Sequence, residues 1–415
     1  MIKNILLVLV AAALPLRAMS SDVHLRLPEI ANEVLTPKSD AYTLAEIHEK
    51  AVGDQVDLQI AYQNLLQAQN KIAQARAQYF PYGLGTIGVL YYLNSWNPLI
   101  LVELVTSLPT KIYNVQKEKN LRMATLYSNK ALALNIKNQI DNLYYTILKE
   151  ESSLKLAELE LQLLETLYSS EMDNVALGST SELDLRKLEL RILDTRDIVL
   201  KFHSYLIEEK SAFNILIGND PSDTLELQPV AGFLSSEDFD LNVDQLRAQA
   251  LERSPELVAA GYVINAAYKN RSSFKWSFLS FSGIGFGYWA NLNVAGSQVK
   301  AAQHNKVMTA QNISNQVYVL NTEFQRTVNF FENERALTTD SEIYYEAELA
   351  RFNSQEINLS RLAESGILYV KDFAQMIAAH YNALGKLSDF ERTVNGKLLK
   401  EDEAEKLLTQ NSDLN

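Results

Sequence analysis

The side chains that could carry out chemistry are few in this chain and form no recognisable catalytic group. No cysteine is present among the 415 residues, and the metal-binding motif HExxH is absent. The histidines are His24, His48, His203, His304 and His380. Their spacings match no metal-binding pattern, and no nucleophile elbow occurs. We therefore predict no enzymatic activity, no cofactor and no metal site.

One glycine-rich stretch resembles a phosphate-binding loop at first sight. Gly283, Gly285 and Gly287 alternate with larger residues. A dinucleotide-binding loop needs its glycines at the entrance to a helix. The period-two alternation indicates a strand instead, and we expect no helix directly after it. A nucleotide site is therefore not predicted.

The overall charge narrows the class of partner. Acidic residues outnumber basic ones by 51 to 38, a formal net charge of −13. No basic patch suggests a nucleic-acid partner, and a negative chain is repelled by phosphate and by anionic lipid headgroups. The absence of cysteine excludes disulfides, thiolate metal sites and the lipid-bearing cysteine of a lipoprotein.

The N-terminus has the organisation of an export signal. Lys3 is followed by an apolar run over residues 5–14, and small residues near Ala18 offer a cleavage site. We assign residues 1–20 to a signal peptide and 21–42 to an irregular leader. The alternative is a buried N-terminal helix. No later stretch reaches about 18 uncharged apolar residues, so a transmembrane helix is not expected.

Very long helices dominate the rest of the sequence. Residues 110–177 contain 68 positions without Gly or Pro, and residues 179–217 contain 39 more. Gly and Pro are the residues that cost most in a helix interior, so both runs predict helix. The second run carries a seam at alternating spacings of three and four, typical of a coiled coil. This seam comprises Leu185, Leu188, Ile192, Thr195, Val199, Phe202 and Leu206. Gly178 between the runs predicts the tip of a long antiparallel helical hairpin.

The chain repeats this plan. Residues 50–58 (KAVGDQVDL) match residues 249–257 (QALERSPEL). A second run of 69 residues without Gly or Pro, the helix-breaking residues, ends at Gly366. Asp184 and Asp372 each lie six residues after their glycine. The sequence therefore predicts two repeats, over residues 43–218 and 243–396. A linker occupies residues 219–242, and a C-terminal tail occupies residues 397–415.

Each repeat contains an insert rich in Gly and Pro, over residues 81–109 and 274–296. All three tryptophans lie in these inserts, and their lengths suit two membrane strands and a turn. Two strands cannot span a bilayer alone, so such inserts require several chains to share one barrel. The alternatives are a short soluble hairpin or an interfacial anchor. The expected membrane-interface aromatics are Tyr91, Tyr92, Trp96, Trp276, Tyr288 and Trp289.

The order of these features resembles the TolC family of bacterial outer-membrane efflux and secretion ducts. Residues 43–51 (TLAEIHEKA) resemble the family's opening helix, and residues 296–305 (GSQVKAAQHN) resemble its re-entry into the long helix. Residues 176–184 (ALGSTSELD) and 364–372 (ESGILYVKD) resemble its two hairpin tips. The resemblance covers about residues 43–396.

This resemblance implies a mostly α-helical homotrimer. Its duplicated coiled-coil hairpins would form a periplasmic α-barrel, and its two short β-hairpins per chain would join an outer-membrane β-barrel. The implied function is the outer-membrane duct of a tripartite efflux or type I secretion system in a Gram-negative bacterium, without chemistry of its own. A periplasmic adaptor and an inner-membrane pump are the implied partners. The alternative is a TolC-like periplasmic coiled-coil scaffold with a reduced or absent barrel.

The resemblance also implies particular site residues. The adaptor-contacting tips would comprise Gly178, Thr180, Leu183, Gly366, Ile367, Leu368 and Val370. The constriction would involve Asp372, Asp184 and Gln375. Carboxylates that converge on a three-fold axis raise one another's pKa and attract cations.

Several residues depart from the family pattern. Polar residues 179–181 follow Gly178, where the family has apolar ones, and Leu368 stands where an arginine can tie the gate closed. Gln375 stands where the family has the second acidic residue of its constriction. Plain helix C-caps at the two glycines and ordinary helix-start acids at the two aspartates remain alternatives.

Overall fold

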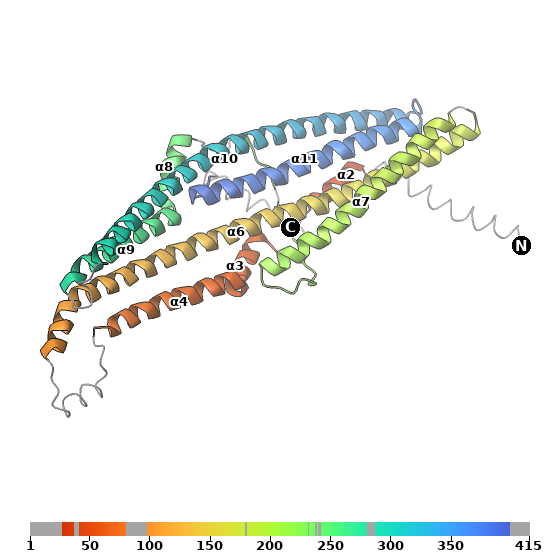
Figure 1. The fold of residues 1–415 in the computed structure, drawn as a ribbon. Helices are drawn as coiled ribbons and strands as arrows, with labels where there is room; N and C mark the ends of the chain where they lie inside the picture. The colour runs from red at the N-terminus through yellow and green to blue at the C-terminus, as the bar shows by residue number, and fades with distance from the viewer. Residues whose placement is uncertain are drawn as a thin grey trace, which may run out of the picture.

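The computed structural model describes residues 27–36, 41–79, 98–178, 181–230, 232–236, 239, 242–279 and 287–398. Within these residues the chain is built from long helices (Figure 1). They are α2 Leu27–Asn32, η1 Glu33–Leu35, α3 Leu44–Asp54, α4 Val56–Ala77, α6 Pro98–Ala176, α7 Glu182–Leu216, α8 Val243–Arg253, α9 Pro255–Trp276, η3 Ser277–Leu279, α10 Tyr288–Asn353 and α11 Leu359–Val394. The prediction of a mostly helical chain with very long helices is confirmed.

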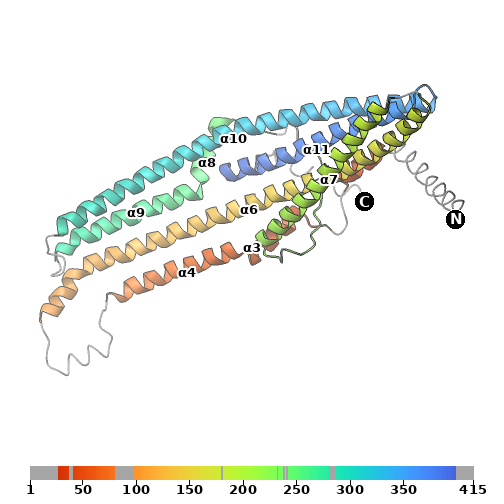
Figure 2. The ribbon, with the colours of Figure 1, turned by 45° about the vertical axis from the view of Figure 1, so that its right-hand side comes forward.

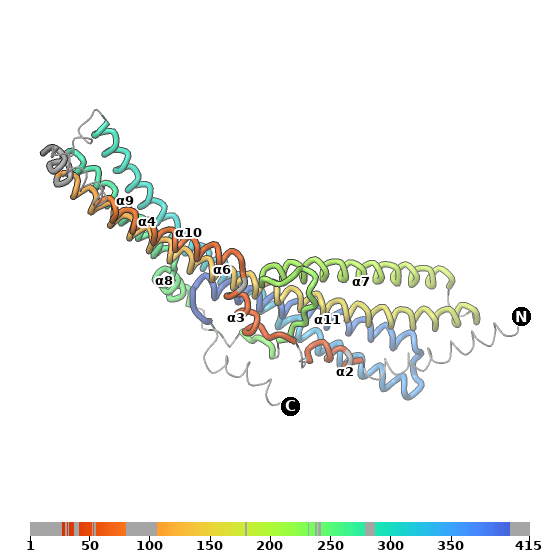
Figure 3. Tube along the Cα trace, turned by 90° about the horizontal axis from the view of Figure 1, so that it is seen from below, coloured from red at the N-terminus to blue at the C-terminus, as the bar shows by residue number. Residues whose placement is uncertain are grey.

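The helices form an elongated, open array around α6. In one half α6 packs between α4 and α9, and α10 packs on the far side of α9. In the other half α6 packs between α7 and α11, and α10 packs on the far side of α11 (Figures 1 and 2). Figure 3 shows that the array bends near α3 and α8. Each half therefore has two edges, α10 on one side and α4 or α7 on the other.

Local capping explains where the shorter helices begin. Thr43 forms a capping box with Glu46, whose backbone N–H lies 3.3 Å from the threonine Oγ1 and whose carboxylate accepts from the Thr43 backbone N–H at 2.8 Å. Two helices follow residue 43, because Gln55 ends α3 and caps α4. Ser254 divides α8 from α9 in the same way. These two residues correspond in the matched segments 50–58 and 249–257.

The second hairpin turns earlier than the sequence analysis indicates. α10 ends at Asn353, residues 354–358 make the turn, and α11 runs unbroken through Gly366. The prediction that Gly366 forms a tip or a C-cap was therefore wrong. Counting breaker residues misplaced the turn because Gln355 takes the left-handed conformation, with φ 61°, that is more usual for glycine.

Much of what was expected to be strand is helix. Residues 98–109 belong to α6, although Pro109 lies inside the helix. Trp276 is the last residue of α9 and Tyr288 is the first of α10. The strand prediction was wrong at these positions because proline is compatible with the start of a helix. Pro98 is the first residue of α6, where a backbone N–H would have no partner within the helix. The remaining parts of both inserts, including Tyr91, Tyr92 and Trp96, lie outside the described residues.

The glycines of residues 283–287 also have a different context from the one expected. α10 begins directly after Gly287, so the absence of a following helix was a wrong reason to exclude a nucleotide site. The spacing of the glycines is a better reason to exclude it, because a G-x-G-x-x-G motif would need glycine where Tyr288 stands. Separately, none of the helices in the described part of the chain is both long enough and apolar enough to cross a bilayer.

The linker between the repeats holds the middle of the array together. Tyr42 and Leu227 form a parallel bridge, and the hydroxyl of Tyr144 on α6 donates to the Gln228 carbonyl at 2.5 Å. Phe233 and Phe239 of the linker pack against aromatic rings of α10. Leader, linker and long helices therefore share one core.

Gly366 is buried where three helices and the leader meet. A Cβ atom at this residue would lie 3.1 Å from Leu27 Cδ2, 3.2 Å from Tyr345 Cε2 and 3.6 Å from Leu163 Cδ1. Leu27 itself is fully buried. The leader was expected to be irregular, but residues 27–35 form α2 and η1. The missing side chain of Gly366 makes room for α2 against α6, α10 and α11.

We expect Gly366→Ala to lower the free energy of unfolding by about 1 kcal/mol, because overpacking outweighs the gain in helix propensity. Gly53→Ala is the matched control, since it also lies in a helix and a Cβ there meets no atom within 4 Å. That variant should gain about 0.5–1 kcal/mol. Urea denaturation of the purified protein measures both. A Gly366→Ala protein as stable as Gly53→Ala would contradict the proposed packing.

Candidate functional site

A partly buried polar group contains the residue types of a catalytic triad in the wrong order. Asp141 Oδ1 lies 2.5 Å from His48 Nε2, and the Ser388 hydroxyl donates to Asp141 Oδ2 at 2.6 Å. A nucleophilic serine needs its base beside it, whereas here the carboxylate lies between the serine and the histidine. The group therefore joins α3, α6 and α11 and has no geometry for nucleophilic catalysis. In the described residues no three His, Asp or Glu side chains are grouped to hold a metal.

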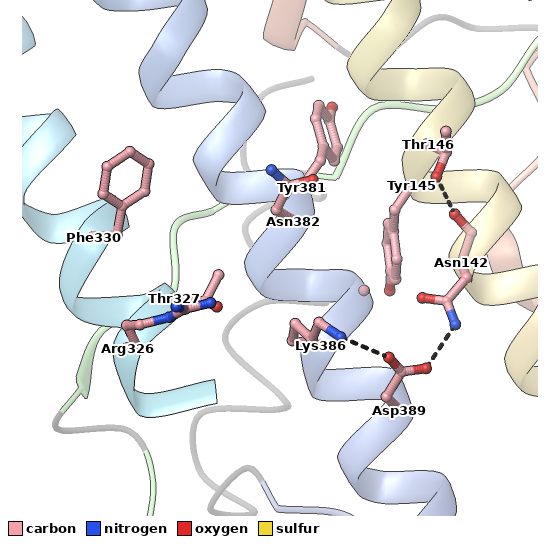
Figure 4. A pocket seen from close by; sticks show the side chains of 11 residues that line it. Asn142, Tyr145, Thr146, Arg326, Thr327, Phe330, Tyr381, Asn382, Lys386 and Asp389 are labelled. Carbon is pink, nitrogen blue, oxygen red and sulfur yellow. Dashed lines mark hydrogen bonds and ion pairs between the residues drawn. The ribbon is translucent and has the colours of Figure 1, made fainter. Parts of the chain in front are cut away.

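Further polar side chains line the contact between α6 and α11, which we call the polar seam. Asp389 accepts hydrogen bonds from the side-chain amides of Asn138 and Asn142, at 3.0 and 2.8 Å. Lys386 lies 3.5 Å from Asp389 and 3.2 Å from Glu323 of α10. A hollow of about 580 Å³ opens beside these residues, where Asn142 and Lys386 converge on Asp389 (Figure 4). Because these groups bond to one another, they fix the register of the helices.

The first hairpin tip is a glycine turn. Gly178 has φ 75°, and its N–H donates to the Val175 carbonyl at 3.0 Å. The Ser181 hydroxyl caps α7 by accepting from the Leu183 N–H at 3.1 Å. Leu177 is 81% exposed and Leu183 is 62% exposed, so this end presents apolar side chains. Thr180 lies outside the described residues.

The second tip has the same backbone plan without glycine. Gln355 occupies the left-handed position, and Asn358 caps α11 three residues later, as Ser181 does three residues after Gly178. The structural counterpart of Gly178 is therefore Gln355. It follows that Asp184 corresponds to Arg361 and not to Asp372.

Arg361 has a definite role at this tip. Its guanidinium donates to both carboxylate oxygens of Glu348, at 3.0 and 3.2 Å, and Arg351 donates to the same carboxylate at 3.0 Å. The Glu348 side chain is almost fully buried. Paired guanidinium donors satisfy a buried carboxylate that would otherwise be costly, so this cluster ties the start of α11 to the end of α10.

The other expected tip and constriction residues are dispersed. Ile367 and Val370 are buried in the helix interface, whereas Leu368 is 45% exposed. None of the three lies in the turn, so their assignment to a tip was wrong. Asp372 is half-buried and Gln375 is exposed on α11. Asp184 is exposed in the first turn of α7, where Lys187 pairs with it at 2.9 Å.

The described interface aromatics do come together. Tyr288 donates its hydroxyl hydrogen to the Lys275 carbonyl at 3.3 Å, next to Trp276 at the end of α9. The ring centroids of Tyr288 and Trp289 lie 5.3 Å apart, and Phe278 lies 6.5 Å from Tyr288. All four residues therefore lie at one end of the array.

His380 was missed as a notable residue, although it was seen to lack metal spacing. It is fully buried on α11, and neither ring nitrogen has a hydrogen-bond partner. Phe233, Phe331 and Tyr381 surround it with ring centroids at 5.1–5.3 Å. Burial among apolar rings lowers the pKa of His380 to about 4. The apolar residues next to His380 in the sequence indicated a buried position, but its contact with Phe233 of the linker could not be predicted from the sequence.

This architecture is an elongated array of long, packed helices. The chain is similar to the Campylobacter jejuni CmeC outer membrane channel, with 11% identity, a TM-score of 0.68 and 89% of each chain covered. It is similar to the Vibrio cholerae outer membrane protein VceC, with 12% identity, a TM-score of 0.65, and 86% of this chain and 96% of VceC covered. The open state of the Neisseria gonorrhoeae MtrE channel gives 13% identity and a TM-score of 0.63, with 86% and 89% covered.

No family model and no curated protein matches the sequence. The structural similarity spans most of this chain and most of each channel chain. The resemblance to TolC-family outer-membrane efflux channels is therefore confirmed, and at these identities it establishes the fold.

The two tips predict opposite effects of exchanging glycine. Gln355→Gly should raise the free energy of unfolding by up to about 1 kcal/mol, because it removes a strained left-handed residue. Gly178→Ala should lower it by a similar amount, since a Cβ there meets no atom within 4 Å and only the backbone is strained. Denaturation curves measure both changes. A destabilised Gln355→Gly variant would refute the equivalence of the tips.

His380 predicts an acid-sensitive core. Its pKa in the folded chain lies below its ordinary value of about 6.5, so the unfolded state binds the extra proton. Stability contributed by neutral His380 should fall as the pH drops from about 6.5 to about 4, by about 3 kcal/mol in all. His380→Leu should remove this part of the pH dependence, and exposed His304→Gln should leave it unchanged. Identical pH profiles for His380→Leu and the unmodified protein would contradict the prediction.

Proposed function

We propose that this chain is the subunit of an outer-membrane duct in an efflux or secretion system. The observation that carries the proposal is the extent of the shared fold, which covers 86–89% of this chain and 89–96% of three solved outer-membrane channels. The proposed duct would pass its substrates without reacting with them. Most of the described mass would lie in the periplasm of a Gram-negative bacterium.

The two edges of the helix array support assembly with further copies. On α7, Leu193, Leu200 and Ile207 repeat every seven residues and are 51–73% exposed. The opposite edge is α10, on which three exposed apolar residues also repeat every seven residues. These three are Phe330, Leu337 and Tyr344. Stripes of this spacing are coiled-coil surfaces, and each still needs a partner helix.

The two stripes differ, so the contact between copies joins one edge to the other. Such a head-to-tail interface closes into a ring when the rotation allows it. The α4 edge repeats the arrangement in the other half of the array, with Val56, Ile60 and Tyr62 more than half exposed. We propose that three copies close the ring, as the family resemblance implies.

The tips are the proposed meeting point with a periplasmic adaptor. Leu177 and Leu183 of the first tip and the turn at residues 354–358 of the second would form it. Buried Ile367 and Val370 are left out of this surface. The proposal does not include a constriction formed by the Asp372 carboxylates, because that role was assigned from a tip at Gly366.

The alternative function is a periplasmic coiled-coil scaffold with the same helices. The two differ in their attachment to the membrane. Outer membranes washed with urea should retain the duct, and light scattering of the detergent-solubilised protein should give three times the chain mass. Release by urea would contradict the duct and favour the scaffold.

The edges provide the test of assembly. The double variant Leu200→Glu and Ile207→Glu should shift the protein from trimer to monomer, because it places charge on an apolar contact. Val263→Glu is the matched control, since Val263 is 41% exposed on α9, which lies inside the array. Size exclusion with light scattering measures the mass. A trimer that survives the double variant would rule out this edge as the interface.

A further inference from the structure

The fold separates charge along the array in a way that the overall composition conceals. We define the basic half as α4, residues 98–140 of α6, α9, and residues 288–322 of α10. It contains thirteen Lys and Arg residues against four acids, although the whole chain has a net charge of −13. The acids are Asp57, Glu103, Glu118 and Glu256. Residues 257–322 contain five bases and no acid. The expectation that this chain repels anionic headgroups was therefore too general.

Ion pairs occupy few of the bases in this half. Lys117 pairs with its neighbour Glu118 at 3.2 Å. In the described part of the basic half no other base forms an ion pair. Lys269 lies over the ring of Tyr113, 5.7 Å from its centroid. This differs from α7, where Lys187 and Lys201 each pair with an aspartate one turn away.

Exposed aromatic residues occupy the outer end of the same half. Trp289 is 71% exposed, Phe278 48% and Trp276 41%. Together with Tyr288 we call them the aromatic end. The ring of Tyr288 contacts those of Phe278 and Trp289 at the point where α9 and α10 meet, and Trp276 ends α9 there. Apolar rings with a polar edge are the side chains that favour the headgroup region of a bilayer.

Several of the bases form a collar beside the aromatic end. We define the collar as Lys111, Lys269 and Lys275. Lys269 and Lys275 lie on the last turns of α9, within about 10 Å of Trp276 along the helix. Lys111 lies at the same level on α6, because neighbouring Thr110 donates to the Ser273 carbonyl at 3.4 Å. The fold thus brings bases from two distant segments to one group of rings.

We propose that this end of the array binds the surface of a bilayer containing anionic phospholipid. The aromatic end lies in the headgroup region, and the collar lysines bind lipid phosphates. The proposal rests on the membrane location given above and names the lipid chemistry that this end recognises. The aromatic residues sit at one end and are not interleaved along a groove, which favours a flat membrane surface over a nucleic acid. Each cation near an anionic surface strengthens binding about fivefold.

The tryptophans provide a direct readout. The chain has three, so Trp96→Phe leaves Trp276 and Trp289 as the only indole fluorophores. This variant is reconstituted into vesicles in which either phosphatidylglycerol or phosphatidylcholine carries brominated chains at equal bromine content. Brominated lipid quenches a tryptophan that it contacts. We expect stronger quenching by brominated phosphatidylglycerol, with a preference that weakens as salt is added.

The collar is tested by neutralising it. Lys111→Gln, Lys269→Gln and Lys275→Gln together should reduce the preference for phosphatidylglycerol about a hundredfold, because each lysine contributes about fivefold, with the tryptophans still quenched. The matched control removes three lysines from the other half of the array. These are Lys187→Gln, Lys201→Gln and Lys371→Gln. The control should retain the preference, because its net charge changes equally but its sites lie elsewhere.

The outcomes separate this inference from the proposed function. Equal quenching by the two lipids, or an equal effect of both triple variants, would overturn recognition of the anionic headgroup. No quenching by either lipid in reconstituted trimers would overturn the anchor, while leaving the duct intact. A chain that urea releases from membranes and that does not enter vesicles would instead refute the proposed function.

Discussion

The whole molecule depends on one constraint: a helix about 120 Å long cannot cover its own apolar stripe. α6 has 79 residues, and its successive parts need different partner helices. α4 and α9 cover one half, and α7 and α11 cover the other. α9 and α11 are covered on their far side by α10, whereas α4, α7 and α10 lie at the edges of the array and expose further apolar side chains. In the proposed assembly another copy would cover that edge, so the need for a partner would follow from helix length.

How much of this could be predicted from the sequence depended on the kind of signal. Composition and the absence of breakers predicted the long helices, and spacing predicted the α7 seam, in which Ile192, Thr195 and Leu206 are buried. Gly178 predicted a turn because its backbone needs a left-handed residue. The same reasoning failed at Gly366, because a glycine also serves where neighbours press too closely for a Cβ atom. Sequence alone does not distinguish these two uses of glycine.

Other features could not be predicted because they arise from segments far apart in the chain. The Glu348–Arg361 pair depends on the true position of the second turn. The cage around His380 needs Phe233, which the linker supplies from residues well before α10. The basic half draws its cations from four helices whose sequences are interrupted by acidic stretches. In each case the residue types were visible, and only the fold showed which of them are neighbours.

The polar seam between α6 and α11 has a mechanical consequence. Asn138 and Asn142 both bond to Asp389, and Ser388 bonds to Asp141, so sliding α11 past α6 would break every one of these bonds at once. The start of α11 lies about 45 Å along the helix from these bonds. The seam therefore fixes the axial position of the second tip relative to α6 across that distance.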